Sequence, residues 1–190
     1  MILEDSIKIK ARPEVIFGFF EEMEGHYLQW HPDHVVFRWV SGRGVKEGHV
    51  FYFEEYIAGK LLKKKVVFTR VIPAQHIEFA PTFWLMKLFL PRMVFRVEQE
   101  PDGCRFIAEI HLRMGPLAQR ANKKELQAVL EHMRVEGVNI KRIVEQEVNR
   151  LGVGNPANEQ EASNNSFNRT GEDSIIYHPI GRDGEIGNLH

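Results

Sequence analysis

One long helical pattern, from Leu117 to Leu151, constrains the fold of this chain more than any other feature. Apolar residues recur there every three or four positions, so they fall on one stripe of a helix. The stripe consists of Leu126, Val129, Leu130, Met133, Gly137, Ile140, Val144, Val148 and Leu151. A long helix with a single apolar face needs a continuous partner. We expect that partner to be the concave face of a curved antiparallel sheet.

Strand patterns precede this helix and would supply such a sheet. Alternating apolar and polar residues, separated by turn residues, predict strands at Ile2–Lys10, Val35–Val40, His49–Ile57, Leu61–Ile72, His76–Phe79, Met93–Glu100 and Arg105–Met114. Two short helices follow the first strand; one opens at Pro13 and the other carries His26 to Trp30. This order predicts an α+β fold and resembles the Bet v 1/START-like helix-grip architecture (SRPBCC), which implies an apolar cavity between sheet and helix.

Composition limits the classes of protein that remain. The net charge of −1 argues against a nucleic-acid-binding protein held by phosphate contacts. The only cysteine, Cys104, excludes an intramolecular disulfide framework and a four-thiolate zinc site. Acidic residues near the N-terminus argue against a signal peptide, and the most apolar run, Phe83 to Pro91, is too short to span a bilayer. We therefore expect a cytoplasmic protein without a transmembrane segment.

The composition changes near residue 151. Residues 152–190 are rich in glycine, asparagine and acidic residues, and would bury little apolar surface. We expect one domain over residues 1–151, followed by a disordered or loosely docked tail over residues 152–190.

The predicted strand His49–Ile57 carries a glutamate on its apolar face. Side chains alternate across a sheet, so Phe51, Phe53 and Glu55 point to one side and Glu54 points to the other. A carboxylate that points into an apolar core is costly unless it is paired or bound to a metal. We expect Glu55 to point inward; the alternative is an edge strand or a bulge that turns it to solvent.

The long helix carries a polar pair beside its apolar stripe. His132 and Glu136 are four residues apart and lie on one face of the helix, at the border of the stripe. This spacing suits two ligands of one metal ion, although most such pairs are simple surface pairs. Gly137 lies on the stripe in mid-helix, where glycine costs about 1 kcal/mol. Close approach of the sheet or of a ligand would explain it; local flexibility is the alternative.

A third polar cluster lies where a helical turn meets a strand. It combines two histidines, an acid and two aromatic residues: Tyr27, Trp30, His31, Asp33 and His34. The alternative interpretation is a polar loop with aromatic anchors.

These segments together resemble the diacetylphloroglucinol hydrolase/phloretin hydrolase group. The resemblance spans about residues 1–150 and rests on Trp30-His31-Pro32-Asp33-His34, Glu55-Tyr56-Ile57-Ala58-Gly59 and His132-x-x-x-Glu136. Enzymes of that group are zinc-dependent, have a Bet v 1-like scaffold, and hydrolyse a carbon–carbon bond between an acyl group and a phenolic ring. Their metal is held by a histidine at a strand start, a glutamate on the next strand and a His-x-x-x-Glu pair on the last helix.

The resemblance implies a set of site residues in this chain. The implied metal ligands are His34, Glu55, His132 and Glu136, with His31 as the alternative to His34. Two imidazoles and two carboxylates suit Zn²⁺ and also admit Mn²⁺ or Fe²⁺. His31 and Tyr27 are the candidate general acids by residue type and neighbourhood. The chain is shorter than the family, and the family's substrate-positioning residues have no clear match, which leaves room for a different substrate.

Two functions follow from the sequence. The first is a metal-dependent hydrolase that acts on a small aromatic or acyl-phenol-like substrate. The second is a metal-free carrier or binding protein for an apolar small molecule or lipid, or a polyketide cyclase-like protein. Both would bind a small apolar or aromatic ligand, and the sequence leaves the oligomeric state open.

Two further segments carry expectations about the surface. We expect the basic run Lys63-Lys64-Lys65 to form a solvated edge. The apolar segment Phe83–Leu90 is expected to be a helix or flap that closes the cavity mouth; a membrane-dipping or dimer-forming patch is the alternative.

Overall fold

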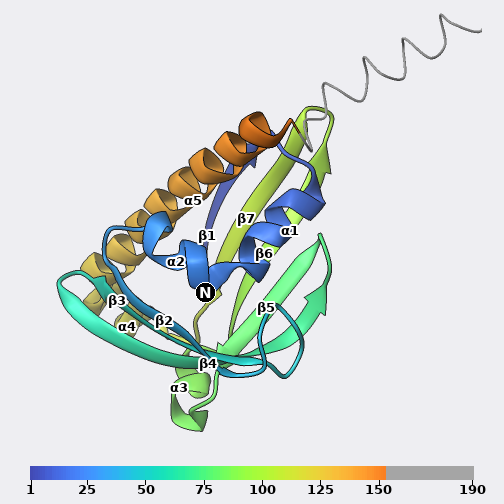
Figure 1. The fold of residues 1–190 in the computed structure, drawn as a ribbon. Helices are drawn as coiled ribbons and strands as arrows, with labels where there is room; N and C mark the ends of the chain where they lie inside the picture. Colours follow the sequence, from blue (N-terminus) through green and yellow to red (C-terminus); the bar gives the residue numbers. More distant parts are fainter. Residues whose placement is uncertain (153–190) are drawn as a thin grey trace, which may run out of the picture. The chain divides into compact units, whose positions relative to one another are not determined.

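The computed structural model describes residues 1–152, which form a seven-stranded antiparallel sheet and five helices (Figure 1). The strands are β1 (Ile2–Ile9), β2 (His34–Ser41), β3 (Val50–Ile57), β4 (Lys60–Ile72), β5 (His76–Pro81), β6 (Arg92–Glu100) and β7 (Gly103–His111). Their order across the sheet is β1-β7-β6-β5-β4-β3-β2, so only the pairing of β1 with β7 joins strands that are distant in sequence. The predicted α+β fold is confirmed.

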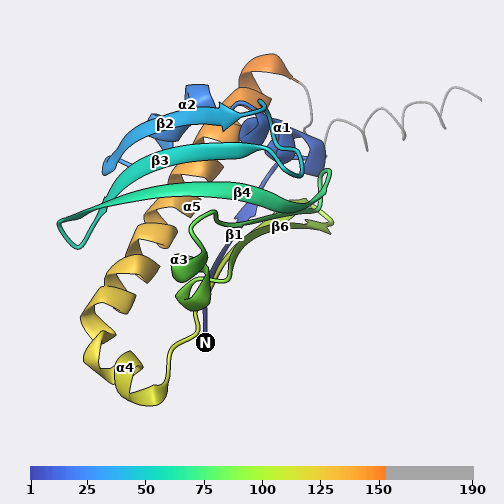
Figure 2. The same cartoon turned by 90° about the horizontal axis from the view of Figure 1, so that it is seen from below.

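The helix α5 (Lys123–Leu151) lies along the concave side of the sheet, which curves around it (Figure 2). The expected apolar stripe supplies four buried residues: Met133, Ile140, Val144 and Val148. At Gly137 strand β1 comes close, because a Cβ there would stand 3.2 Å from Asp5 Oδ2 and 3.6 Å from Ile7 Cγ2. Close approach of the sheet, rather than local flexibility, accounts for the glycine.

The helices α1 (Pro13–Glu21) and α2 (Met23–Trp30) complete the core. Phe20 of α1 stacks on Phe95 and Phe106 of the sheet, with ring centroids 5.0 Å and 5.4 Å away. At the end of α2, the carbonyl of Trp30 accepts a hydrogen bond of 3.0 Å from Asn139 Nδ2 of α5. The segment that follows α2 is therefore held against the middle of α5.

The long C-terminal helix differs from the prediction at its start. The region from Leu117 to Leu151 contains two helices, α4 (Pro116–Ala121) and α5, and Asn122 joins them with φ −103° and ψ 22°. No residue of α4 is buried, and the apolar stripe begins only at Leu126, so packing does not hold α4 in line with α5. The expected tail, residues 152–190, lies outside the described residues apart from its first residue.

The apolar segment between Pro81 and Pro91 forms the helix α3 (Trp84–Phe89), as expected. Its side chains do not cover the interior: none of its residues is buried, and Trp84 is 68% exposed. Of the segment expected to close the cavity mouth, only its last residue, Leu90, lines the cavity, and the residues of α3 do not. Within residues 1–152, every helix is too short or too polar to cross a bilayer.

Candidate metal and ligand-binding site

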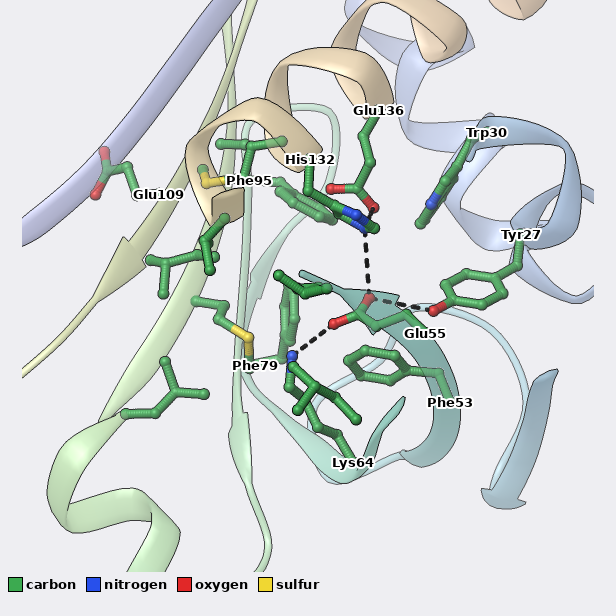
Figure 3. Close-up of a pocket in the computed structure, with 18 of the residues that line it drawn as sticks. Tyr27, Trp30, Phe53, Glu55, Lys64, Phe79, Phe95, Glu109, His132 and Glu136 are labelled. Carbon is green, nitrogen blue, oxygen red and sulfur yellow. Dashed lines mark hydrogen bonds and ion pairs between the residues drawn. The ribbon is translucent and has the colours of Figure 1, made fainter. Parts of the chain in front are cut away.

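A cavity of about 250 Å³ lies between the sheet and α5 (Figure 3). Aromatic and aliphatic side chains form most of its wall, among them Phe53, Phe79, Met93 and Phe95. Polar side chains also line it: Tyr27, Glu55, Lys64, Glu109, His132 and Glu136. Pockets for drug-sized molecules measure about 300–1,000 Å³, so this cavity has room for a smaller compound with one or two rings.

Glu55 points into this cavity from β3, as strand alternation predicts. It is 6% exposed, whereas Glu54 lies on the outer face, where it pairs with Lys63. Burial alone would raise the pKa of the Glu55 carboxyl group. Lys64 Nζ lies 2.6 Å from Glu55 Oε1 and, together with His132 and the neighbouring histidine of β2, holds this pKa below its ordinary value. Glu55 is therefore an ionised carboxylate inside a largely apolar cavity.

A β-bulge at the start of β2 brings His34 to the same place. Regular alternation would put His34 and Phe37 on opposite faces of the sheet, because they are three residues apart. The register shifts between His34 and Val36, so His34 pairs with Glu55 while Val35 remains exposed. The bulge thus turns the imidazole inward, where its side chain is 0% exposed.

His132 and Glu136 approach from α5 and complete a group of four. His34 Nε2 lies 3.0 Å from Glu136 Oε1 and 3.8 Å from Glu55 Oε2. His132 Nε2 lies 3.8 Å from Glu55 Oε2 and 3.9 Å from Glu136 Oε1, and all four ligand atoms lie within 4.8 Å of one another. In a tetrahedral zinc site with bonds of about 2.0–2.2 Å, neighbouring ligand atoms stand about 3.3–3.6 Å apart. The four printed separations, 3.0–3.9 Å, lie on both sides of this spacing, so the group could hold one metal ion after small side-chain shifts.

The hydrogen bonds of His34 direct its Nε2 atom at this group. His34 Nδ1 lies 2.7 Å from the carbonyl oxygen of Tyr27, so Nδ1 carries the proton and donates it. Trp30 Nε1 donates to Nε2 across 3.3 Å, which requires a lone pair on Nε2, whereas Glu136 Oε1 at 3.0 Å would require a proton there. A cation bound to both Nε2 and Glu136 would remove the need for a proton on Nε2, and it would take the lone pair that otherwise accepts from Trp30.

His132 Nε2 is buried and has no hydrogen-bond partner among the described residues. The oxygens of Glu55 and Glu136 at 3.8 Å and 3.9 Å are beyond hydrogen-bond range. An unsatisfied buried polar group costs about 1–3 kcal/mol, and a metal ion among these atoms would remove that cost.

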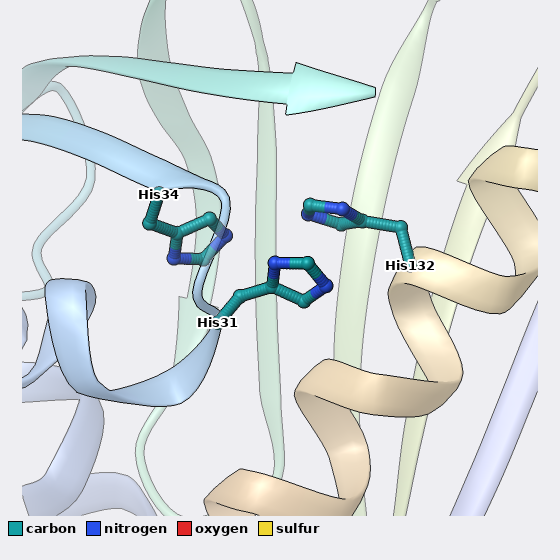
Figure 4. A group of neighbouring side chains, drawn as sticks. All are labelled: His31, His34 and His132. Atoms are coloured by element: carbon teal, nitrogen blue, oxygen red, sulfur yellow. The ribbon is translucent and has the colours of Figure 1, made fainter. Parts of the chain in front are cut away.

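His31, the alternative histidine, lies against the other members of the site (Figure 4). Its ring stacks on His132 with centroids 3.7 Å apart, and its Nδ1 accepts a hydrogen bond of 3.0 Å from the backbone N–H of Asp33. Burial and the nearby His132 lower the pKa of His31, so its imidazole is neutral near pH 7. His31, His34 and His132 also form a possible three-nitrogen ligand group. The four-residue group with both carboxylates, however, contains His34 and not His31.

Tyr27, the second candidate acid, is 3% exposed and stacks on His34 with ring centroids 3.9 Å apart. Its hydroxyl oxygen lies 3.5 Å from Glu55 Oε2. Burial, followed by the charges of Glu55 and Glu136, raises the pKa of Tyr27 far above its ordinary value. The hydroxyl group therefore stays protonated at neutral pH and can donate a hydrogen bond.

Lys64 is a cavity residue that the sequence interpretation missed. The run Lys63-Lys64-Lys65 was expected to be a solvated edge, but only Lys63 and Lys65 are exposed. Lys64 shares the inward face of β4 with Val66 and Phe68, both buried. The same alternation that placed Glu55 inward could have identified Lys64.

Comparisons with known proteins support the fold. No family model and no curated protein match the sequence. Among solved structures, the chain is similar to the KanY protein, with a TM-score of 0.61 and 11% identity over 76% of this chain and 97% of that one. It is similar to the Zhui aromatase/cyclase from Streptomyces sp. R1128, with a TM-score of 0.58 and 13% identity over 78% and 95%. It is also similar to the di-domain ARO/CYC BexL from the BE-7585A biosynthetic pathway, with a TM-score of 0.53 and 13% identity over 77% and 49%.

At such low identity these likenesses show the fold alone, which this chain shares with the aromatase/cyclases: a curved antiparallel sheet around a long C-terminal helix. The expected helix-grip architecture is confirmed. Nothing in the comparisons supports membership of the zinc-dependent diacetylphloroglucinol/phloretin hydrolase family, so the expected metal and reaction remain hypotheses about the site.

Proposed function

We propose that the cavity binds a small apolar or aromatic molecule and that His34, Glu55, His132 and Glu136 hold a divalent metal ion beside it. The observation that carries the metal proposal is the buried His132 Nε2, which lacks a hydrogen-bond partner among the described residues and faces three other ligand atoms. Two nitrogen and two oxygen ligands favour Zn²⁺, with Mn²⁺ or Fe²⁺ as alternatives.

The chemistry that this arrangement supports is hydrolysis of an acyl group next to an aromatic ring. The metal, when bound, supplies a Lewis acid that can polarise a carbonyl group and lower the pKa of a water molecule. Water would provide the hydroxyl group of the released acid and the proton that returns to the ring carbon. Tyr27, protonated and 3.5 Å from Glu55, can hold the carbonyl oxygen or the ring hydroxyl group in place. His31, neutral and stacked on His132, can relay a proton at the edge of the site.

A metal-free binding protein or cyclase is the other candidate, and the comparisons support it better than they support a metal-dependent hydrolase. Lys64 Nζ lies 2.6 Å from Glu55 Oε1, and His34 Nε2 lies 3.0 Å from Glu136 Oε1, so a His34 protonated on both nitrogens would give each carboxylate a polar partner without a metal. Two of the similar structures are named as aromatase/cyclases. Under this proposal the polar group would orient a ligand in the cavity.

Zinc binding separates the two candidates. We expect the purified full-length protein to bind about one equivalent of zinc, and its melting temperature to rise with added zinc, because a ligand that binds only the folded state stabilises it by about 2.7 kcal/mol at 100 times its Kd. Glu55→Gln should lose most of this shift, because the amide keeps the shape of the side chain but is a weaker ligand.

Glu54→Gln is the matched control for that experiment. Glu54 is the neighbouring residue on β3 but lies on the outer face and pairs with Lys63. It should keep both the zinc and the thermal shift. A wild-type protein that binds no zinc after reconstitution would exclude the metal-dependent enzyme and leave the metal-free protein.

A further inference from the structure

The ammonium group of Lys64 lines the cavity and lies beside Glu55 (Figure 3). Its Nζ atom is 2.6 Å from Glu55 Oε1 and 5.3 Å from the ring centroid of Phe53. The side chain is 15% exposed, while Lys63 on the same strand is 58% exposed. Lys64 therefore belongs to the wall of the cavity rather than to the basic outer face of β4.

This ammonium group has more donors than the protein has acceptors for them. A lysine ammonium carries three N–H donors. Among the described residues, Glu55 Oε1 is the one hydrogen-bond acceptor found for Nζ. The other contact is the face of Phe53, and nearby wall residues such as Phe79 and Met93 offer no strong acceptor. The remaining donors thus face the space that a ligand would occupy.

The net charge of the site indicates which kind of ligand would accept hydrogen bonds from the remaining N–H donors of Lys64. Glu109 also lines the cavity, but its carboxylate pairs with Arg96 and His111, each at 2.7 Å. With the metal of the proposed function in place, the carboxylates of Glu55 and Glu136, the ammonium group of Lys64 and one divalent cation leave a single net positive charge in an apolar cavity. A buried net charge is costly unless a counter-charge accompanies it. A ligand with one acidic oxygen would supply that counter-charge and accept the hydrogen bonds of Lys64.

We propose that Lys64 forms an anion subsite, so that the cavity selects a small aromatic compound carrying one acidic oxygen, such as a carboxylate or phenolate. The aromatic body would lie against Phe53, Phe79 and Phe95, and the oxygen would accept from Lys64 Nζ. This inference rests on the proposed function, because the metal supplies two of the positive charges. Without the metal, the same residues carry one net negative charge and would disfavour an anion.

The test compares two isosteric probes, 2-naphthoate and its neutral carboxamide, by calorimetric titration of the zinc-loaded full-length protein. We expect 2-naphthoate to bind more tightly than 2-naphthamide. Lys64→Met keeps the apolar stem and removes the charge, so it should weaken 2-naphthoate binding about tenfold, the value of one charge-assisted hydrogen bond. It should leave 2-naphthamide binding within about threefold.

Lys65→Met is the matched control, since Lys65 is the exposed neighbour that points away from the cavity. It should leave the affinity for both probes unchanged, and circular dichroism should show that both variants are folded. Equal weakening of both probes by Lys64→Met would mean that Lys64 only stabilises the cavity, and would overturn the anion subsite. Unchanged 2-naphthoate binding would overturn it as well.

Zinc content, measured separately by equilibrium dialysis, keeps this inference distinct from the proposed function. A protein that binds zinc but shows no Lys64-dependent preference for 2-naphthoate contradicts the anion subsite and leaves the metal site intact. A protein that binds no zinc contradicts both, because the net positive charge is then lost.

Discussion

The two sides of the cavity are built in different ways. The polar group comes from β2, β3 and the middle of α5, and His34, Glu55 and His132 are each less than 10% exposed. On the side lined by Leu90 and Leu112, the neighbouring helices α3 and α4 are one or two turns long and contain no buried residue. The comparison indicates where precision is needed: the side chains that meet within a few ångströms lie on packed elements, whereas the apolar end of the cavity has exposed helices beside it.

The largest effect on zinc affinity is expected from removing one of the proposed metal-binding side chains. His34→Ala should lower zinc affinity at least about 100-fold, because loss of even an outer partner of a metal ligand costs about 10–100-fold. Competition with a chromophoric chelator would measure it.

Val35→Ala is the control for this variant, because Val35 is the exposed residue of the same bulge. It should keep the zinc. If His31→Ala abolishes zinc binding and His34→Ala does not, the three-histidine group is the metal site instead.

Low pH should remove the stabilisation of the folded protein by bound zinc. Histidine binds a metal only when it is neutral, so protons compete with zinc as the pH falls from about 7.5 to 5. The folded-state pKa of Glu55 is below its ordinary value, so its contribution to stability persists above that ordinary value and is lost only as the pH falls through the lowered pKa. The histidines should therefore set the transition.

The measurement is the zinc-induced change in melting temperature at several pH values. We expect a shift that is large at pH 7.5 and absent at pH 5. A shift that persists undiminished at pH 5 would show that histidines are not among the ligands.

A smaller effect is expected where β1 contacts α5. A leucine at position 137 would place its side chain against Asp5 and Ile7, since a Cβ alone would stand 3.2 Å from Asp5 Oδ2. Overpacking typically costs about 1–3 kcal/mol, and better helix propensity returns somewhat less than 1 kcal/mol. Gly137→Leu should therefore lower the free energy of unfolding by about 1–2 kcal/mol in urea denaturation.

Val138→Leu provides the control for Gly137→Leu. Val138 is the next residue but is 46% exposed, so its substitution should change the free energy of unfolding by less than about 0.5 kcal/mol. Equal stability of Gly137→Leu and the wild type would show that the sheet does not hold α5 tightly at the polar side.

Periodicity predicted most of the fold and one part of the site. The alternation of β3 placed Glu55 inward, and the stripe of α5 placed His132 and Glu136 beside the buried face; the structure agrees with each placement. These predictions succeeded because, within a regular strand or helix, the periodicity of that element alone determines the face on which a side chain lies.

His34 could not be placed in this way. Alternation along β2 groups it with the outer-facing residues Val36 and Arg38, and only the bulge reverses it. The bulge depends on the pairing of β2 with β3 and has no local sequence signal. The resemblance to a metal-binding family pointed to His34, because the resemblance rests on the polar residues of the three segments and not on the alternation of side chains along a strand.

The smallest effect is expected at α3. Trp84 is 68% exposed and does not line the cavity, so Trp84→Ala removes little packing. Stability should change by less than about 0.5 kcal/mol, as for most surface substitutions. Zinc affinity and 2-naphthamide binding should be unchanged. If Trp84→Ala weakens 2-naphthamide binding while zinc affinity stays constant, α3 closes over the cavity when a ligand binds, and the two sides of the cavity are less different than this structure shows.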